Sequence, residues 1–216
     1  MDPDERTLPL FPLHVVLFPD MPLPLHIFEP RYRLMLGRCL AEGQPFGVVL
    51  IRAGRDVGAP ATPYSVGTTA AILHHQRLPD GRYQILTVGR ARFRVRDLDR
   101  RQPYLSGAVE PLPEPDPPPG AAELAAQLRA EARAFLAATA VSPSSSLPSD
   151  PVALSYALPP LLGLPLHEQQ ALLETLAVGA RLERLRALLT RERHLGPHVG
   201  PTLPVTPSTA GWPSPN

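Results

Sequence analysis

The chain has 216 residues, of which 44% are hydrophobic and 19% charged, and its formal net charge is +1. These values exclude a fibrous or highly charged disordered protein and are typical of a soluble globular chain with one domain or two small ones. The near-neutral charge gives no sign of a polyanionic partner, and the 30 prolines indicate many rigid, irregular segments.

The first predicted elements lie in residues 8–36, where prolines recur within a strongly apolar sequence. Each proline fixes φ and lacks a backbone donor, so we expect only short or edge strands here. Residues 15–18 form the one uninterrupted strand pattern. A helix is predicted to begin at Pro30, with Tyr32, Leu36 and Leu40 on one face.

Residues 46–109 contain further strand patterns separated by turns. The Asp80-Gly81 pair predicts a hairpin, and the alternation from 91 to 97 predicts a strand with Phe93 and Val95 on one face. Five or six short strands joined in this way indicate a small closed or half-closed barrel. The predicted strands cover residues 46–52, 66–75, 82–88, 91–97 and 104–109.

The second half of the chain reads as a helical part. Residues 113–120 are a proline-rich linker, and leucines at helical spacing after it predict a helical bundle over 121–195. Asp150 and Pro151 are suited to the cap and first position of one of its helices. We expect disorder in residues 1–6 and in the proline-rich tail 196–216, although Trp212 leaves a short peptide motif there as an alternative.

Several blocks, in the same order, are similar to those of a known family. L-P-L-F-P-L, V-L-F-P and L-P-L-H-I-F-E-P-R-Y-R in residues 8–33 are followed by F-G-V-V, V-G-T and I-L-T-V-G, and later by E-Q-Q-A-L-L. This pattern resembles the amino-terminal, substrate-binding domain of Lon proteases over residues 8–195. The resemblance implies an α+β fold, with a PUA-like β pseudobarrel in residues 7–112 followed by a small helical bundle subdomain.

All 21 positively charged side chains are arginines, because the sequence contains no lysine. A phosphate-binding loop of the G-x-x-x-x-G-K-[ST] kind and a Ser-Lys catalytic dyad both require lysine. We therefore expect a free-standing form of the Lon substrate-binding domain, without the ATPase and peptidase domains, and no enzymatic activity.

No constellation of residues predicts catalysis, a metal or a cofactor. Cys39 lies among apolar residues of the first predicted helix and is expected to be buried. His74 and His75 are neighbours on a strand and point to opposite faces, so they are poorly placed to bind one ion.

Two sets of residues are candidates for binding. Met21, Pro22 and Leu23 form a proline-bracketed apolar loop that could contact polypeptides, the alternative being that Met21 and Leu23 are core residues. The second set is an arginine stripe that alternates along one strand and could attract a phosphate backbone, the alternative being a solvated or salt-bridged face. The arginine stripe comprises Arg90, Arg92, Arg94 and Arg96.

The resemblance implies a non-catalytic polypeptide-recognition module, an adaptor in protein quality control that binds unfolded or tagged polypeptides for a protease or chaperone. Recognition would use the cleft between the β and helical parts together with pairing at an open strand edge. The alternative is an RNA-binding module that uses the arginine stripe on a PUA-like fold. We expect a cytoplasmic protein with no membrane partner, because no apolar run is long enough to span a bilayer and no signal peptide is visible.

Overall fold

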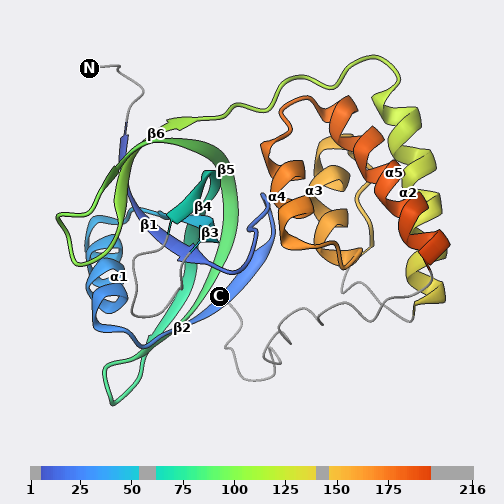
Figure 1. Cartoon of the computed structure of the whole chain (residues 1–216). Helices are drawn as coiled ribbons and strands as arrows, with labels where there is room; N and C mark the ends of the chain where they lie inside the picture. The colour runs from blue at the N-terminus through green and yellow to red at the C-terminus, as the bar shows by residue number, and fades with distance from the viewer. Residues whose placement is uncertain (1–5, 54–61, 140–145, 196–216) are drawn as a thin grey trace.

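The computed structural model describes residues 6–53, 62–139 and 146–195. Six strands and one helix form a barrel in the first part of the chain, and four helices form the second part beside it (Figure 1). This architecture confirms the predicted α+β fold. The strands are β1 (Arg6–Leu13), β2 (Pro22–Ile27), β3 (Phe46–Ala53), β4 (Thr62–Arg77), β5 (Tyr83–Asp99) and β6 (Ser106–Pro111).

The sheet closes on itself through its longest strand. Its order is β2-β5-β4-β3-β1-β6, and the second half of β5 also pairs with β6. The first half of β5 pairs with β2 and β4, so the 17 residues of this strand serve two regions of the sheet. The sequence predicted two strands, 82–88 and 91–97, where the structure has one continuous strand.

The proline-rich opening folds differently from the prediction. Residues 15–18 are unpaired, although Val16, Leu17 and Phe18 are buried. Leu17 packs in one core cluster, whereas Val16 and Phe18 pack in another. The run of apolar residues that resembled a strand therefore comes from burial on two sides, and this segment makes no strand pairing.

Strand β1 is internal to the sheet rather than short or at an edge, despite Pro9 and Pro12. Its first half pairs with β6 and its second half pairs in parallel with β3. Because each half is paired mainly on one side, the missing proline donors leave few gaps in the ladder.

Strand β2 lies at the edge of the sheet, and the backbone groups of its two prolines point to the open side of that edge. Gly89 N donates to Met21 O at 2.9 Å, which makes Met21 and Gly89 a hydrogen-bonded pair of the antiparallel ladder. By alternation, the backbone groups of Pro22 and Pro24 then point away from β5. The open edge therefore lacks two donors, which blunts it against pairing with another strand.

Helix α1 (Pro30–Glu42) closes one end of the barrel. Tyr32, Met35, Leu36 and Cys39 are its buried residues and pack against the barrel core. Pro30 occupies the first turn, as predicted, and the left-handed Gly43 ends the helix.

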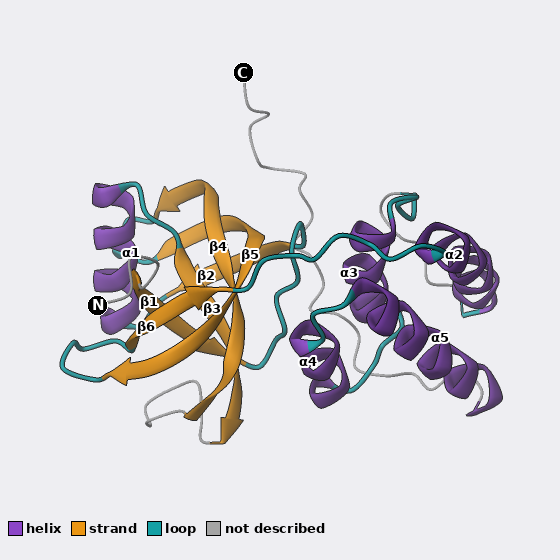
Figure 2. Ribbon diagram, turned by 90° about the horizontal axis from the view of Figure 1, so that it is seen from above, coloured by secondary structure: helices purple, strands orange, loops and turns teal. Residues whose placement is uncertain are grey.

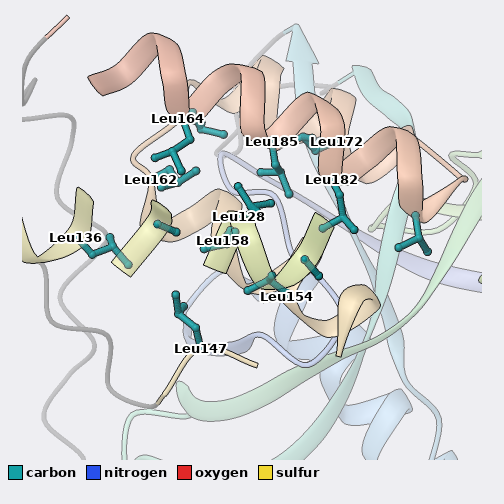
Figure 3. Close-up of a cluster of buried hydrophobic side chains, with 14 of the residues drawn as sticks. Leu128, Leu136, Leu147, Leu154, Leu158, Leu162, Leu164, Leu172, Leu182 and Leu185 are labelled. Atoms are coloured by element: carbon teal, nitrogen blue, oxygen red, sulfur yellow. The ribbon is translucent and has the colours of Figure 1, made fainter. Parts of the chain in front are cut away.

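The helical part consists of α2 (Ala121–Ala138), α3 (Pro151–Leu161), α4 (Leu166–Glu174) and α5 (Val178–Leu195). Leucines from all four helices meet in one buried cluster (Figure 3). Asp150 caps α3 as predicted, because its Oδ2 accepts from Ala153 N at 2.8 Å.

The two parts lie side by side, and the segment after β6 crosses from the barrel to α2 (Figure 2). Arg6 already belongs to β1, whereas the rest of the predicted disordered start and the whole tail 196–216 lie outside the described residues. The proposed domain boundaries stay a prediction. In the described part of the chain, no helix is both long and apolar enough to cross a membrane.

Candidate functional site

A groove with a volume of about 340 Å³ opens where the barrel meets the helical part. Four segments far apart in the sequence form it: the turn before β2, the middle of β5, the segment after β6 and the start of α3. We call it the junction groove. It is lined by Pro19, Asp20, Arg90, Ala91, Arg92, Pro111, Leu112, Pro113, Glu114, Asp150, Val152, Ala153 and Tyr156.

One wall of the junction groove depends on a close backbone approach. A Cβ atom at Gly89 would lie 2.1 Å from Phe18 O, so only glycine lets the chain pass this close to β5. Asp20 then adopts a positive φ of 60°, and its N–H donates to Gly89 O at 2.9 Å. This turn places Pro19 and Asp20 at the groove.

The floor of the groove is a buried ionic network centred on Glu114. Arg92 Nη2 donates to Glu114 Oε2 at 2.8 Å, Arg181 Nη2 donates to Oε1, and the Tyr156 hydroxyl also donates to the carboxylate. The Arg92 and Arg181 side chains are 1% and 0% exposed, and that of Glu114 is 27% exposed. We call these four residues the junction network.

Two buried guanidiniums share one carboxylate, and backbone carbonyls at the end of α4 complete their coordination. Thr175 O accepts from Arg92 Nη1 at 2.9 Å and from Arg181 Nη1 at 2.8 Å, and Leu173 O accepts from Arg92 Nη1 at 3.0 Å. The carboxyl end of a helix carries partial negative charge, which favours cations there. The junction network therefore ties β5, the segment after β6, α3, α4 and α5 together.

Burial shifts the pKa values of Arg92 and Tyr156. It lowers the pKa of Arg92, although the neighbouring Tyr156 and Glu114 act in the opposite direction. Burial also raises the pKa of Tyr156, and the hydrogen bond to Glu114 raises it further. Tyr156 thus stays neutral at physiological pH and packs its ring against both guanidiniums, 4.2 Å from Arg181 Cζ and 5.5 Å from Arg92 Cζ.

For Leu23, the structure corrects the proline-bracketed candidate site. Leu23 is 6% exposed and belongs to the barrel core, and Met21 is half-buried against two core clusters. Leu23 cannot contact a polypeptide from this position, because its place on β2 turns its side chain inward. Only Pro22 of the three is exposed.

The arginine stripe is not one solvated face. Arg92 is buried in the junction network, because the helical part packs onto that side of β5. Arg94 and Arg96 both pair with Glu110, at 3.7 and 2.5 Å, and Arg90 lies 3.8 Å from Asp20. The salt-bridged interpretation describes Arg90, Arg94 and Arg96, whereas neither interpretation predicted the buried, structural role of Arg92. RNA binding by the stripe stays a prediction.

The described residues contain no group of three or more His, Cys, Asp or Glu side chains placed to hold a metal ion. Cys39 is buried as predicted, and burial raises the pKa of its thiol to about 11. A neutral, buried thiol is a poor nucleophile. The junction groove combines apolar walls with charged rims, and this arrangement suits binding.

Sequence reasoning missed Glu114, Tyr156 and Arg181. Glu114 lies among prolines that read as a linker, and Tyr156 and Arg181 lie in helices whose leucine pattern dominates. Only Arg181 gave a signal in the sequence: it stands directly before Leu182, at the start of the leucine pattern of its helix. A cation at the edge of an apolar helical face could have indicated a buried ion pair.

Comparison with known proteins agrees with this architecture. Residues 7–191 match the sequence model of the ATP-dependent protease La (LON) substrate-binding domain. The chain belongs to this family. The match includes the barrel, the segment after β6 and nearly all of the helical part, so the junction groove lies inside the family's domain.

Among relatives, Lon protease 2 of Syntrophobacter fumaroxidans is 32% identical over 198 residues, which are 87% of this chain and 24% of that protein. Lon protease 2 of Myxococcus xanthus is 28% identical over 201 residues, which are 88% of this chain and 24% of that protein. The chain thus spans about a quarter of the length of these Lon proteases.

Solved structures of the family share the fold. A Lon N-terminal domain protein from Xanthomonas campestris is 30% identical, with a TM-score of 0.65 over 84% of this chain and 98% of that one. The N-terminal domain of a Mycobacterium avium complex Lon protease superposes with a TM-score of 0.68 at 20% identity, over 86% of this chain and 98% of that one.

Proposed function

We propose that this chain is a non-catalytic polypeptide-recognition module, an adaptor in protein quality control that presents unfolded or tagged polypeptides to a protease or chaperone in the cytoplasm. The family to which it belongs is the substrate-binding domain of Lon proteases, which supports a role in recognition. The observation that carries the proposal for this chain is the junction groove, a cleft between two parts of the fold with mainly apolar walls and a buried ionic floor.

The groove has the properties that binding an extended polypeptide requires. Its walls contain three prolines, whose fixed backbone keeps the site preformed and lowers the entropy lost on binding. Its volume is near the lower end of the roughly 300–1,000 Å³ of small-ligand sites, so it admits one or two side chains at a time. Contacts of this size favour weak, sequence-tolerant recognition.

Strand addition at β2 contributes little to the proposed mechanism. Pro22 and Pro24 remove two donors from the open edge, so an added strand would find an incomplete ladder there. Side-chain contacts in the groove therefore supply most of the recognition.

The test is the binding of a dye-labelled, permanently unfolded model polypeptide, measured by fluorescence anisotropy over a salt series. Ala91 is exposed on the groove wall, and Ala91→Asp places a charge in the apolar cleft. We expect at least about tenfold weaker binding, or about 1.4 kcal/mol. Ala187→Asp on the exposed face of α5, away from the groove, is the matched control and should bind as the unmodified protein does.

The same experiment tests the RNA-binding alternative. Single-stranded RNA replaces the polypeptide, and Arg94→Ala with Arg96→Ala removes the two members of the arginine stripe that lie outside the junction groove, without touching the buried Arg92. Polypeptide binding that persists at high salt supports the proposal. RNA binding that falls steeply with salt and is lost in the double variant would establish the alternative.

A further inference from the structure

Residues 196–216 contain features that match the junction groove. They include Trp212, the only tryptophan of the chain, flanked by Gly211 and Pro213, and they contain no aspartate, glutamate, arginine or lysine. An uncharged segment brings no ion of its own that would have to lose its water on entering the groove. The tail thus carries one large aromatic anchor in an otherwise small and proline-rich sequence.

The chain is long enough to bring Trp212 back to the groove. Arg181 marks the groove end of α5, and the helix runs away from the barrel from there (Figure 1). Its end at Leu195 is about 21 Å from Arg181 along the axis, at about 1.5 Å per residue. The 17 residues from Leu195 to Trp212 span up to about 56 Å when extended, so more than twice the required distance is available.

The groove offers an indole ring partners of the right chemistry. Its walls are apolar, and the Asp20 carboxylate at its rim is 80% exposed, so it can accept from the indole N–H. The Arg90 side chain is 56% exposed at the same rim, where its guanidinium can stack on the aromatic face. The cavity of about 340 Å³ has room for one such side chain and its neighbours.

We propose that the segment around Trp212 occupies the junction groove of its own chain and competes there with polypeptide ligands. The competition rests on the proposed function, whereas the docking of Trp212 does not. A segment tethered to its own site can experience an effective concentration in the mM range. An intrinsic dissociation constant of about 0.1 mM would then hold the groove about nine-tenths occupied and weaken an outside ligand about tenfold.

Docking is tested by the intrinsic fluorescence of Trp212, which is the protein's only indole signal. In the full chain we expect a blue-shifted emission and slower acrylamide quenching than in a synthetic peptide of residues 205–216. Ala91→Asp and, separately, Arg90→Ala should move both readouts toward the peptide values, whereas the control Ala187→Asp should not. Circular dichroism of each variant establishes that it is folded.

Emission and quenching equal to those of the free peptide would overturn the proposal. A blue shift that persists in both groove variants would place Trp212 elsewhere and overturn it as well, and a shift that fades on dilution would show docking between copies instead.

Competition is tested by the anisotropy experiment with Trp212→Ala, for which we expect about tenfold tighter polypeptide binding. If Trp212 docks but no polypeptide binds to either form, the proposed function fails while the docking stands. Competition is refuted if the polypeptide binds equally well to the unmodified protein and to Trp212→Ala, while Ala91→Asp still weakens that binding.

Discussion

Glu114→Gln tests whether the junction network holds the two parts of the fold together. The substitution keeps the shape of the side chain but removes the one carboxylate that Arg92 and Arg181 share, while both guanidiniums remain almost fully buried. Removing one partner of a buried ion pair costs about 3–5 kcal/mol. Because Glu114 is 27% exposed and water can partly replace it, we expect a loss of about 2–4 kcal/mol in the free energy of unfolding.

Glu110→Gln is the matched control. Glu110 also forms ion pairs with two arginines, but the Arg94 and Arg96 side chains are 37% and 54% exposed. Ion pairs of this kind contribute about 1 kcal/mol or less, so the control should remain close to the unmodified protein.

Urea unfolding followed by circular dichroism measures both variants. With a slope of about 2 kcal/mol per M, the midpoint of Glu114→Gln should fall by about 1–2 M. A split into two transitions would be a further sign that the barrel and the helices had been uncoupled. If Glu114→Gln falls no further than Glu110→Gln, the carbonyls at the end of α4 alone neutralise the two guanidiniums, and the assigned role of Glu114 is refuted.

Two further predictions concern the barrel. Gly89→Ala should lower the free energy of unfolding by about 2–4 kcal/mol in urea titrations, because its Cβ would lie 2.1 Å from Phe18 O. Gly37→Ala is its control: it meets open space on α1 and should stabilise the protein by about 0.5–1 kcal/mol, so equal effects would contradict the close approach. Burial raises the pKa of Cys39 from 9.0 to about 11, so the stability that its neutral thiol contributes is complete below pH 9 and lost as pH rises to 11. In thermal or urea unfolding at pH 8 to 11, the free energy of unfolding should fall by up to about 1.4 kcal/mol per pH unit above pH 9 because of this thiol. The Cys39→Ala variant should not show this part of the fall. Identical pH profiles for the two proteins would show that the thiol does not titrate in this way.

The sequence predicted the fold class because the relevant signals are local. Pro30, the Asp80-Gly81 turn and the Asp150 cap each restrict a few neighbouring residues, and the structure confirms all three. The leucine seam of the helical part is equally local, since helical spacing alone brings its members to one face.

The junction groove could not be predicted in this way. Its walls come from four segments separated by up to about 137 residues, and no local pattern brings Asp20 near Tyr156. The alternation at Arg92 also looks the same whether its face meets water or another part of the protein. Only the packing of the helical part onto β5 decides that one arginine of the stripe is buried and the next is not.

The carboxylate at the centre of the junction network belongs to the connecting segment, three residues beyond the end of β6. Inserting a single residue before Glu114 would displace that carboxylate by about 3.3 Å, more than the length of the hydrogen bonds it makes. The segment would tolerate changes of sequence between Pro115 and Pro119 far better than a change in the number of residues between Pro111 and Glu114. The segment between β6 and Glu114 therefore does more than connect the two parts: its length fixes how the barrel and the helical part face each other.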